Sequence, residues 1–371
     1  MNLPRHQRAR PTFLDLFERG ESETITAMDL GGHDIPNQVP DAPLRLKRVG
    51  LTRSSIPVLI DDPFGSGACV QISCTVNMRV TLDGDRRGIH VSRIGDLLAR
   101  LSGKTYPSLQ AYAGELNALL RPAQESQSAA VFVEGVFTYL ESVHGVKQKE
   151  SLEHLDLFAA CEVIDGRAES SSGVGFSHIT ACPCVQATYR NSFAPPQSSA
   201  AGIHEKAPLL THTQRCKTRI LILDGPERLS LSELLGRIDD VVVRSQNTLP
   251  RELELLNVYR AHARPQFLED AVRDLLVAVY RLVRDRSPEA TIQVKSVSME
   301  SIHDFDMEGE IEFSVPELDR IVSAVDKNTH LVATLLEPKI HGTNGTAHVV
   351  AHASDIPQNA GEKNPGKPLQ I

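Results

Sequence analysis

The stretch Val70-Gln-Ile-Ser-Cys-Thr-Val-Asn-Met-Arg-Val-Thr-Leu82 decides the fold class of this chain, because every second residue along it is apolar. This alternation is typical of a β-strand that buries one face and leaves the other in water. Residues 44–60 form a second strand-like run, and the loop Gly65-Ser-Gly67 lies between the two. A glycine-containing loop between two such runs predicts an antiparallel strand pair.

Beyond this pair, apolar residues recur at the three- and four-residue steps that are typical of helices. Helices are predicted at 94–101, 109–120, 129–143, 231–243, 267–284 and near 316–326. Further strands are predicted at 156–164, 173–181, 219–223, 292–298 and 309–315, and a loop at 191–208. Strands in pairs followed by helices in pairs predict an α+β protein with an antiparallel sheet and helices on one face.

Length and composition narrow the class of protein. The chain has 371 residues, of which 41% are apolar and 23% charged, as in soluble globular proteins. It has no apolar run of about 20 residues and no secretory signal, which predicts a cytoplasmic protein without a membrane partner. The net charge of −8 argues against nucleic acid as a partner. Six sparse cysteines predict reduced thiols instead of a disulfide framework.

The sharpest local signal is Thr180-Ala-Cys-Pro-Cys184, at the end of a predicted strand. Pro183 restricts the backbone between the two thiols, and this spacing allows one thiol to enter a site while the other faces the core. Two buried structural cysteines are an equally common reading. Thirty residues after Cys182, the polar segment Thr211-His-Thr-Gln-Arg215 offers His212 as a second candidate ligand.

Two more candidate ligands lie further along the chain. His303 falls in Met299-Glu-Ser-Ile-His-Asp-Phe-Asp306, between two predicted strands, where the alternative is a loop histidine beside a capping Asp. Glu254 closes Pro250-Arg-Glu-Leu-Glu254, where the alternative is a solvated carboxylate at a helix end. A thiolate, two imidazoles and a carboxylate form a normal ligand set for Zn²⁺ or Fe²⁺. Periodicity cannot assemble these residues, because they are far apart in the sequence.

Two further segments could bind a substrate. Glu269 lies in Pro265-Gln-Phe-Leu-Glu-Asp270, at the first turn of a predicted helix. It could interact favourably with the positive end of the helix dipole. Alternatively, it could be a buried carboxylate that accepts two hydrogen bonds from the N–H groups of a guanine-like edge. The segment Asp85-Arg-Arg-Gly-Ile-His-Val-Ser-Arg93 places basic residues where a strand enters a helix. Such a segment binds phosphate or is a solvated basic turn.

Five segments resemble, in order, the signatures of the type IB GTP cyclohydrolases. They are Asp85–Arg93, Thr180–Gln186, Thr211–Arg215, Pro265–Asp270 and Glu300–His303. That family includes the archaeal enzyme that opens the methanopterin pathway. The similarity runs from about Asp34 to Val315. Each motif alone is weak evidence, but five motifs in the same order are strong evidence.

The resemblance implies a tunnelling fold, in which antiparallel strand pairs are backed by helix pairs in two similar halves. It implies a homo-oligomer, a dimer or tetramer, with active sites at subunit interfaces. On this basis we expect a flexible N-terminal segment at 1–40 and a catalytic domain at 41–330, with halves of about 41–150 and 151–330. Residues 331–371 are expected to form a C-terminal extension and tail.

The resemblance also implies roles for single residues. Cys182 resembles the thiolate ligand, and Cys184 is then structural. The implied metal ligands are Cys182, His212, Glu254 and His303. The implied substrate contacts are Glu269 for the guanine and His90, Arg93 and Arg215 for the triphosphate.

The chemistry that the resemblance implies is hydrolytic opening of the guanine imidazole ring of GTP at C8. A bound metal lowers the pKa of water from about 15.7 to about 7, so that hydroxide exists at neutral pH. His303 or His212, whichever does not bind the metal, could protonate the departing ring nitrogen. A thiolate suits Fe²⁺ or Zn²⁺, and Glu254 would also admit Mn²⁺.

Formate would then leave, and the ring would close to a 7,8-dihydroneopterin phosphate, either the triphosphate or the 2′,3′-cyclic phosphate. Residues 245–254 differ from the family pattern, which motivates an alternative: a related tunnelling-fold enzyme that acts on another guanine nucleotide. A third hypothesis is a non-catalytic protein that binds purine nucleotides through Glu269.

Overall fold

The computed structural model of the chain describes residues 34–142, 150–193 and 210–324. The chain divides into two units, Met1–Ile321 and Val322–Ile371, and nearly all described residues belong to the first. The predicted flexible segment at 1–40 lies mostly outside the described residues, and the predicted tail at 331–371 lies entirely outside them.

The described strands form a single mixed sheet. They are β1 (Leu46–Asp61), β2 (Cys69–Leu82), β3 (Thr105–Tyr106), β4 (Ala129–Ser142), β5 (Glu150–Ile164), β6 (Arg167–Ala181), β7 (Thr213–Leu223), β8 (Val243–Arg244), β9 (Thr291–Met299) and β10 (Asp306–Ser314). Their order is β10-β9-β7-β6-β5-β4-β2-β1-β3, with β8 beside β6. All neighbours are antiparallel except β1 and β3, so the predicted α+β class with a largely antiparallel sheet is confirmed.

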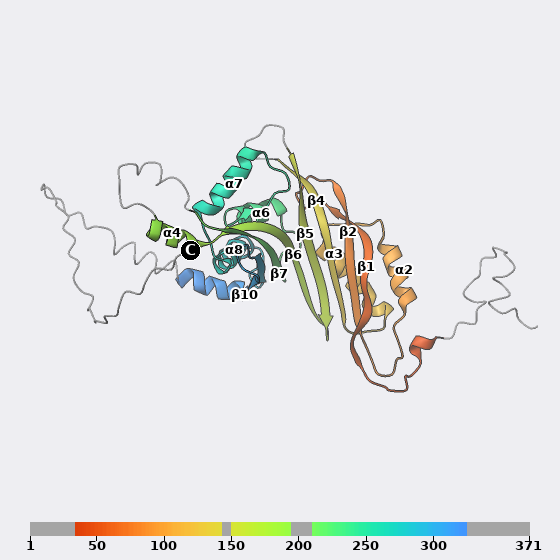
Figure 1. Cartoon of the computed structure of the whole chain (residues 1–371). Coiled ribbons are helices and arrows are strands. Elements are labelled where there is room, and N and C mark those ends of the chain that lie inside the picture. The colour runs from red at the N-terminus through yellow and green to blue at the C-terminus, as the bar shows by residue number, and fades with distance from the viewer. Residues whose placement is uncertain (1–33, 143–149, 194–209, 325–371) are drawn as a thin grey trace, which may run out of the picture. The chain divides into compact units, whose positions relative to one another are not determined.

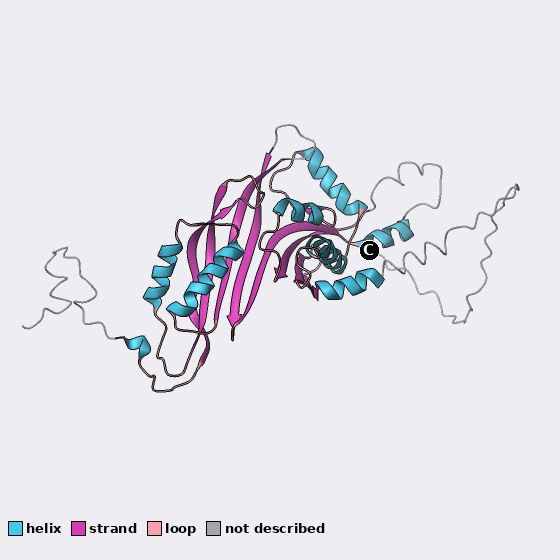
Figure 2. Cartoon of the chain, turned by 180° about the vertical axis from the view of Figure 1, so that it is seen from behind, coloured by secondary structure: helices cyan, strands magenta, loops and turns pink. Residues whose placement is uncertain are grey.

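The helices pack on this sheet in two groups (Figures 1 and 2). The described helices are the 3₁₀ turn η1 (Ile35–Asn37), α2 (Val91–Leu101), α3 (Leu109–Ala123), α4 (Pro183–Phe193), α6 (Leu231–Asp239), α7 (Arg251–Ala263) and α8 (Leu268–Val283), followed by a helical stretch over 315–324. Helix α3 packs on β4 and β5 with α2 beside it, while α8 packs on β9 and β10 with α6 beside it. None of the helices in the described part of the chain is long and apolar enough to cross a membrane.

The β1–β2 hairpin behaves as its alternating sequence predicts. Ile72, Cys74, Val76 and Met78 are at most 2% exposed, and they alternate with more exposed neighbours. The turn that joins the strands is held by Asp62, whose carboxylate accepts the backbone N–H groups of residues 64 and 66. Gly65 and Gly67 both have φ of 81°, a left-handed conformation that glycine adopts without strain.

The prediction of a helix at 129–143 is wrong, because these residues form strand β4. Ala129, Val131, Val133 and Phe137 are at most 5% exposed, so the buried positions follow a period of two. The strand is hydrogen-bonded to β2 on one side and to β5 on the other. A short apolar run rich in Val and Phe fits both periods, and its place between two strands decides the outcome.

Two other boundaries differ from the prediction. The helix predicted at 231–243 ends at Asp239, and Val241 and Val242 are buried before β8 begins. Part of the predicted loop 191–208 is helical, because α4 continues to Phe193, while 194–209 lie outside the described residues. The buried stripe of the helix predicted at 267–284 is confirmed by Val272, Leu275 and Val279, each at most 3% exposed.

Candidate active site

Cys182 and His212 lie side by side at one end of the sheet. Cys182 directly follows β6, and His212 directly precedes β7. The backbone N–H of Cys182 donates to the carbonyl of His212 at 3.1 Å, and the hydroxyl of Thr211 donates to the carbonyl of Cys182 at 2.7 Å. Antiparallel pairing of β6 with β7 therefore brings together two candidates that are thirty residues apart. Cys184 lies in α4 and is exposed.

The turn that carries His303 reaches the same end of the sheet. Strands β7 and β9 pair with Arg215 opposite Met299, which places the β9–β10 turn next to the start of β7. The hydroxyl of Ser301 lies 3.4 Å from Nδ1 of His212. His303 is exposed and stacks on Phe305, with ring centroids 4.9 Å apart. Its imidazole is thus free to meet a ligand from solvent.

The end of α7 and the start of α8 complete this region. The backbone N–H of Gln266 donates to the carbonyl of Ala181 at 3.1 Å, which anchors the first turn of α8 beside β6. Nε2 of His262, near the end of α7, lies 3.3 Å from the carbonyl of Thr211. Glu269 lies in that first turn of α8 but is exposed, so the expected burial of this carboxylate is not found in the single chain.

The fold does not gather Glu254 with Cys182 in one chain. Glu254 is exposed near the beginning of α7, eight residues before His262, a separation of about 12 Å along a helix axis. Within the described residues, no group of three or more His, Cys, Asp or Glu side chains is arranged to hold a metal ion. One chain therefore brings together Cys182, His212 and the turn of His303, but not the complete predicted ligand set.

The loop before α7 is held by the ends of β4 and β5. Glu153 is 5% exposed, and both its carboxylate oxygens accept the backbone N–H of Asn247, at 3.0 and 3.2 Å. The side chain of Arg244 is 8% exposed and donates to Asp239 at 2.6 Å and to Glu141 at 2.8 Å. These contacts position the segment 245–250 that leads into α7, and sequence reasoning did not single them out.

The three candidate triphosphate contacts lie in different surroundings. His90 is 8% exposed at the start of α2, and its backbone N–H and carbonyl both bond to the side chain of Gln124 at 2.9 Å. Arg93 donates to Glu125 at 2.9 Å, which lowers the pKa of that carboxyl. Both belong to the α2–α3 group over β4 and β5. Arg215 is exposed on β7, three residues after His212, at the candidate site itself.

A buried polar network lies beneath the site and was also missed. His178 is fully buried, and Nε2 lies 2.8 Å from the hydroxyl of Thr218, which lies 2.7 Å from that of Ser296. Burial lowers the pKa of His178 to about 4 and raises the pKa of the neighbouring Cys216 thiol. The only available signal was a set of polar residues at inward positions of three adjacent strands.

Comparison with known proteins identifies the family of the chain. The family model for type I GTP cyclohydrolase folE2 matches residues 33–308. GTP cyclohydrolase MptA of Thermoplasma volcanium is 23% identical over 272 residues, covering 73% of this chain and 91% of the relative. GTP cyclohydrolase MptA 2 of Methanocella arvoryzae is 27% identical over 311 residues, covering 77% and 97%. Uricase from Arthrobacter globiformis aligns with a TM-score of 0.44 and 6% identity, covering 72% and 93%.

The chain is an enzyme with an α+β fold and a largely antiparallel sheet. It belongs to the type I GTP cyclohydrolase folE2 family, so the resemblance drawn from the five motifs is confirmed.

Proposed function

We propose that this chain opens the imidazole ring of GTP at C8 by hydrolysis, releases formate and forms a 7,8-dihydroneopterin phosphate, either the triphosphate or the 2′,3′-cyclic phosphate. The observation that carries the proposal is the placement of Cys182, His212 and the turn of His303 at one end of the sheet, in a chain of this family. A thiol and two imidazoles so placed suit hydrolysis of a ring C–N bond.

The donor chemistry of the same residues suits a divalent metal ion, although one chain does not gather three of them around a single point. Cys182 is only partly buried, and His212 and His303 are accessible, so a soft thiolate and imidazole donors are available to Fe²⁺ or Zn²⁺. Glu254 would add an oxygen donor that also suits Mn²⁺, provided that it comes from a second chain or that α7 shifts. When bound, the ion would supply hydroxide at neutral pH.

The chain's own residues then orient the base and move a proton. Glu269 is exposed at the first turn of α8, where its carboxylate can accept the ring N–H and the amino group of guanine. The imidazole of His212 or His303 that does not hold the ion donates a proton to the ring nitrogen as the C8–N bond breaks. Arg215, exposed on β7 three residues after His212, would contact the phosphates.

A homo-oligomer would complete the site. His90 and Arg93 belong to the β1–β5 part of the chain, so they reach the phosphates only if a second copy brings its α2 there. Strand β10 is an edge of the sheet, and β1 at the other edge is covered by β3 only at Leu59 and Ile60. Such open edges can pair with those of another copy. We therefore propose a tunnelling fold of two similar halves, assembled as a dimer or tetramer with active sites between subunits.

The test is anaerobic incubation of the metal-stripped protein with GTP, with Fe²⁺, Mn²⁺ or Zn²⁺ added back separately. Formate release and the mass of the pterin product are measured. The proposal expects formate with at least one ion and a product mass that identifies the triphosphate or the cyclic phosphate. GTP binding without formate under every condition would refute catalysis and favour a non-catalytic nucleotide-binding protein.

A further inference from the structure

A cavity lies on the helix side of the sheet, away from the candidate active site. It has a volume of about 660 Å³, within the range of about 300–1,000 Å³ that is typical of small-molecule sites. Its floor is formed by β5, β6 and β7, and Val174 on this floor precedes Cys182 by eight residues. A strand of that length spans about 26 Å. The cavity therefore shares no residue with the candidate active site.

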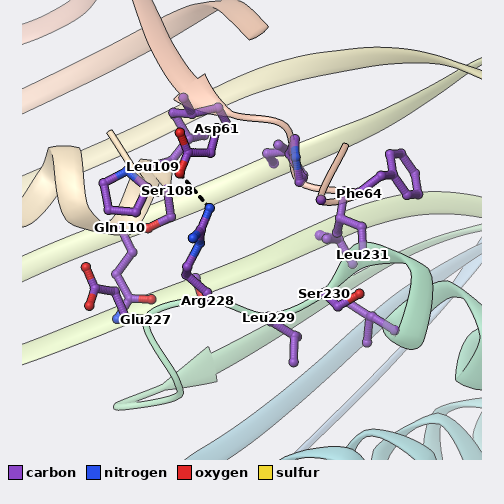
Figure 3. Close-up of a pocket in the computed structure, with 18 of the residues that line it drawn as sticks. Asp61, Phe64, Ser108, Leu109, Gln110, Glu227, Arg228, Leu229, Ser230 and Leu231 are labelled. Atoms are coloured by element: carbon purple, nitrogen blue, oxygen red, sulfur yellow. Dashed lines mark hydrogen bonds and ion pairs between the residues drawn. The ribbon is translucent and has the colours of Figure 1, made fainter. Parts of the chain in front are cut away.

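The two walls of the cavity come from segments far apart in the sequence and are joined by hydrogen bonds. One wall is the β1–β2 turn and the start of α3, and the other is the start of α6 (Figure 3). Arg228 donates to Asp61 at 2.6 Å, and the backbone N–H of Leu231 donates to the carbonyl of Pro63 at 3.3 Å. These bonds hold the opposite walls at a set separation, so the cavity is built into the fold.

The lining has an apolar body and a polar rim. The apolar groups are Ile60, Leu109, Leu157, Val174, Ile220, Ile222, Leu229, Leu231 and Leu234. Most polar groups in the lining already have hydrogen-bond or ion-pair partners within the protein. Arg286 forms two bonds to Glu233, at 2.7 and 3.1 Å, and the hydroxyls of Ser108 and Ser230 cap their own helices.

Two acceptors in the lining lack a protein partner among the described residues. The side-chain oxygen of Gln110 is buried without a hydrogen bond, although its amide nitrogen donates to Ser170 at 3.0 Å. Glu227 lines the cavity with no ion pair or hydrogen bond in the described structure. In the view of Figure 3 both lie on the side opposite Phe64. The Gln110 oxygen is closed to solvent, so a ligand in the cavity cannot reach it, whereas the Glu227 carboxylate is exposed and open to a ligand that carries N–H groups.

The balance of charge in the lining disfavours phosphorylated ligands. Asp61, Asp62, Glu227 and Glu233 line the cavity against Arg228 and Arg286, and both arginines are already paired with carboxylates. A nucleotide would therefore meet an acidic wall with no free cation. A planar heterocycle whose amino group and ring N–H form an amidine-like edge can instead donate two parallel hydrogen bonds to one carboxylate.

We propose that this cavity is a second ligand site, which binds an unphosphorylated amino-heterocycle with its N–H edge on Glu227 and its ring on the apolar floor. The site is independent of the proposed cyclohydrolase reaction, because the two share no residue. Its occupation would bridge the two walls that Arg228 and Leu231 already connect.

The absence of tryptophan from the chain allows a site-specific test. Phe64→Trp places a single fluorophore on the cavity wall, and Phe305→Trp, made separately, places one beside His303. Pterin (2-amino-4-hydroxypteridine) is the probe, and quenching is corrected for absorbance with N-acetyltryptophanamide. We expect saturable quenching of Trp at position 64 that persists with saturating GTP, while GTP alone leaves this signal unchanged.

Two variants in the Phe64→Trp background locate the binding. Glu227→Gln is expected to weaken pterin binding about tenfold or more, because a hydrogen bond to a charged acceptor is lost. Glu289→Gln, an exposed carboxylate outside the cavity, is the matched control and should leave the affinity unchanged. Ser172→Phe fills the cavity from its floor and should abolish binding. If that variant does not fold, the Glu227 pair still decides.

The proposal is overturned by any of three results. These are no saturable quenching up to the solubility limit of pterin, equal affinity in Glu227→Gln and Glu289→Gln, or displacement of the probe by GTP. Formate release by the unmodified enzyme is measured in parallel, so failure of this site is distinguished from failure of the proposed function.

Discussion

Replacement of Arg244 by Met should cost more stability than any surface charge, because this guanidinium is buried among three partners. Arg244 donates to both oxygens of Asp239, to Glu141 and to the hydroxyl of Tyr139 at 3.1 Å. Its pKa is raised because these hydrogen bonds outweigh the effect of burial. The charge is therefore retained at all ordinary pH values, and the loss on substitution does not depend on pH between 6 and 9.

The magnitude follows from the exposure of the partners. Breaking a fully buried pair costs about 3–5 kcal/mol, because an uncompensated charge stays inside. Here Glu141 is 20% exposed and Asp239 is 46% exposed, so water can reach both carboxylates once the arginine is gone. We therefore expect a loss of about 2–3 kcal/mol in the free energy of unfolding.

Urea denaturation followed by circular dichroism measures this loss, with Arg237→Met as the control. Arg237 lies 3.9 Å from Asp240 on the surface, with exposures of 52% and 72%, so its removal should cost about 0.5 kcal/mol or less. If Arg244→Met lowers stability no more than Arg237→Met, the reasoning from burial is refuted. Because Arg244 also holds the segment before α7, Arg244→Met should shift the end of α7 and weaken metal binding in a chelator competition.

Three further predictions concern the candidate site and the core beneath it. Thr211→Val removes the hydroxyl that holds the carbonyl of Cys182, and should weaken metal binding about 10–100-fold by chelator competition, whereas Thr188→Val, which removes a similar bond to Cys184 at 2.9 Å, should not. Equal effects of the two substitutions would contradict a positioning role for Thr211. Cys182→Ala should abolish both stoichiometric metal and formate release, and Cys184→Ala should leave both near the wild-type level; the reverse result would exchange their roles. The pKa of His178 is lowered on folding to about 4, so its contribution to stability is complete above the unfolded value of about 6.5 and is lost as pH falls from there to 4. The free energy of unfolding, measured by urea denaturation, should fall over this range by up to about 1 kcal/mol per pH unit, and the dependence should be weaker in His178→Gln; identical pH profiles would contradict the assignment.

Much of the fold could be predicted in segments whose apolar residues fit only one period, either that of a strand or that of a helix. The alternation of 70–82 and the stripe of α8 are both confirmed, because each is long enough to exclude the other period. The prediction of a helix over 129–143 is wrong, because the Val and Phe residues of this run fit both periods. Helix α7 has no apolar face to detect, since Leu255 and Val258 are 70% and 49% exposed.

The sequence predicted which residues belong to the candidate site, but not how they are arranged in space. Motifs in order along the chain sufficed to identify the family and to select Cys182, His212 and His303. They did not show that Glu254 lies about 12 Å along α7 from the turn that contacts Thr211, nor that Glu269 is exposed. These facts depend on how α7 and α8 pack against the end of β6.

The sequence by itself determined the α+β class, the main strands, the buried face of α8 and the chemistry of the candidate ligands, because each depends on residue type and local spacing. Only the tertiary structure decided that Cys182 lies beside His212, that Arg244 and Glu153 hold the segment before α7, and that a cavity opens between α3 and α6. These are contacts between residues from 5 to more than 100 positions apart. Most of them are set by strand pairing and packing, which no local pattern of apolar residues encodes.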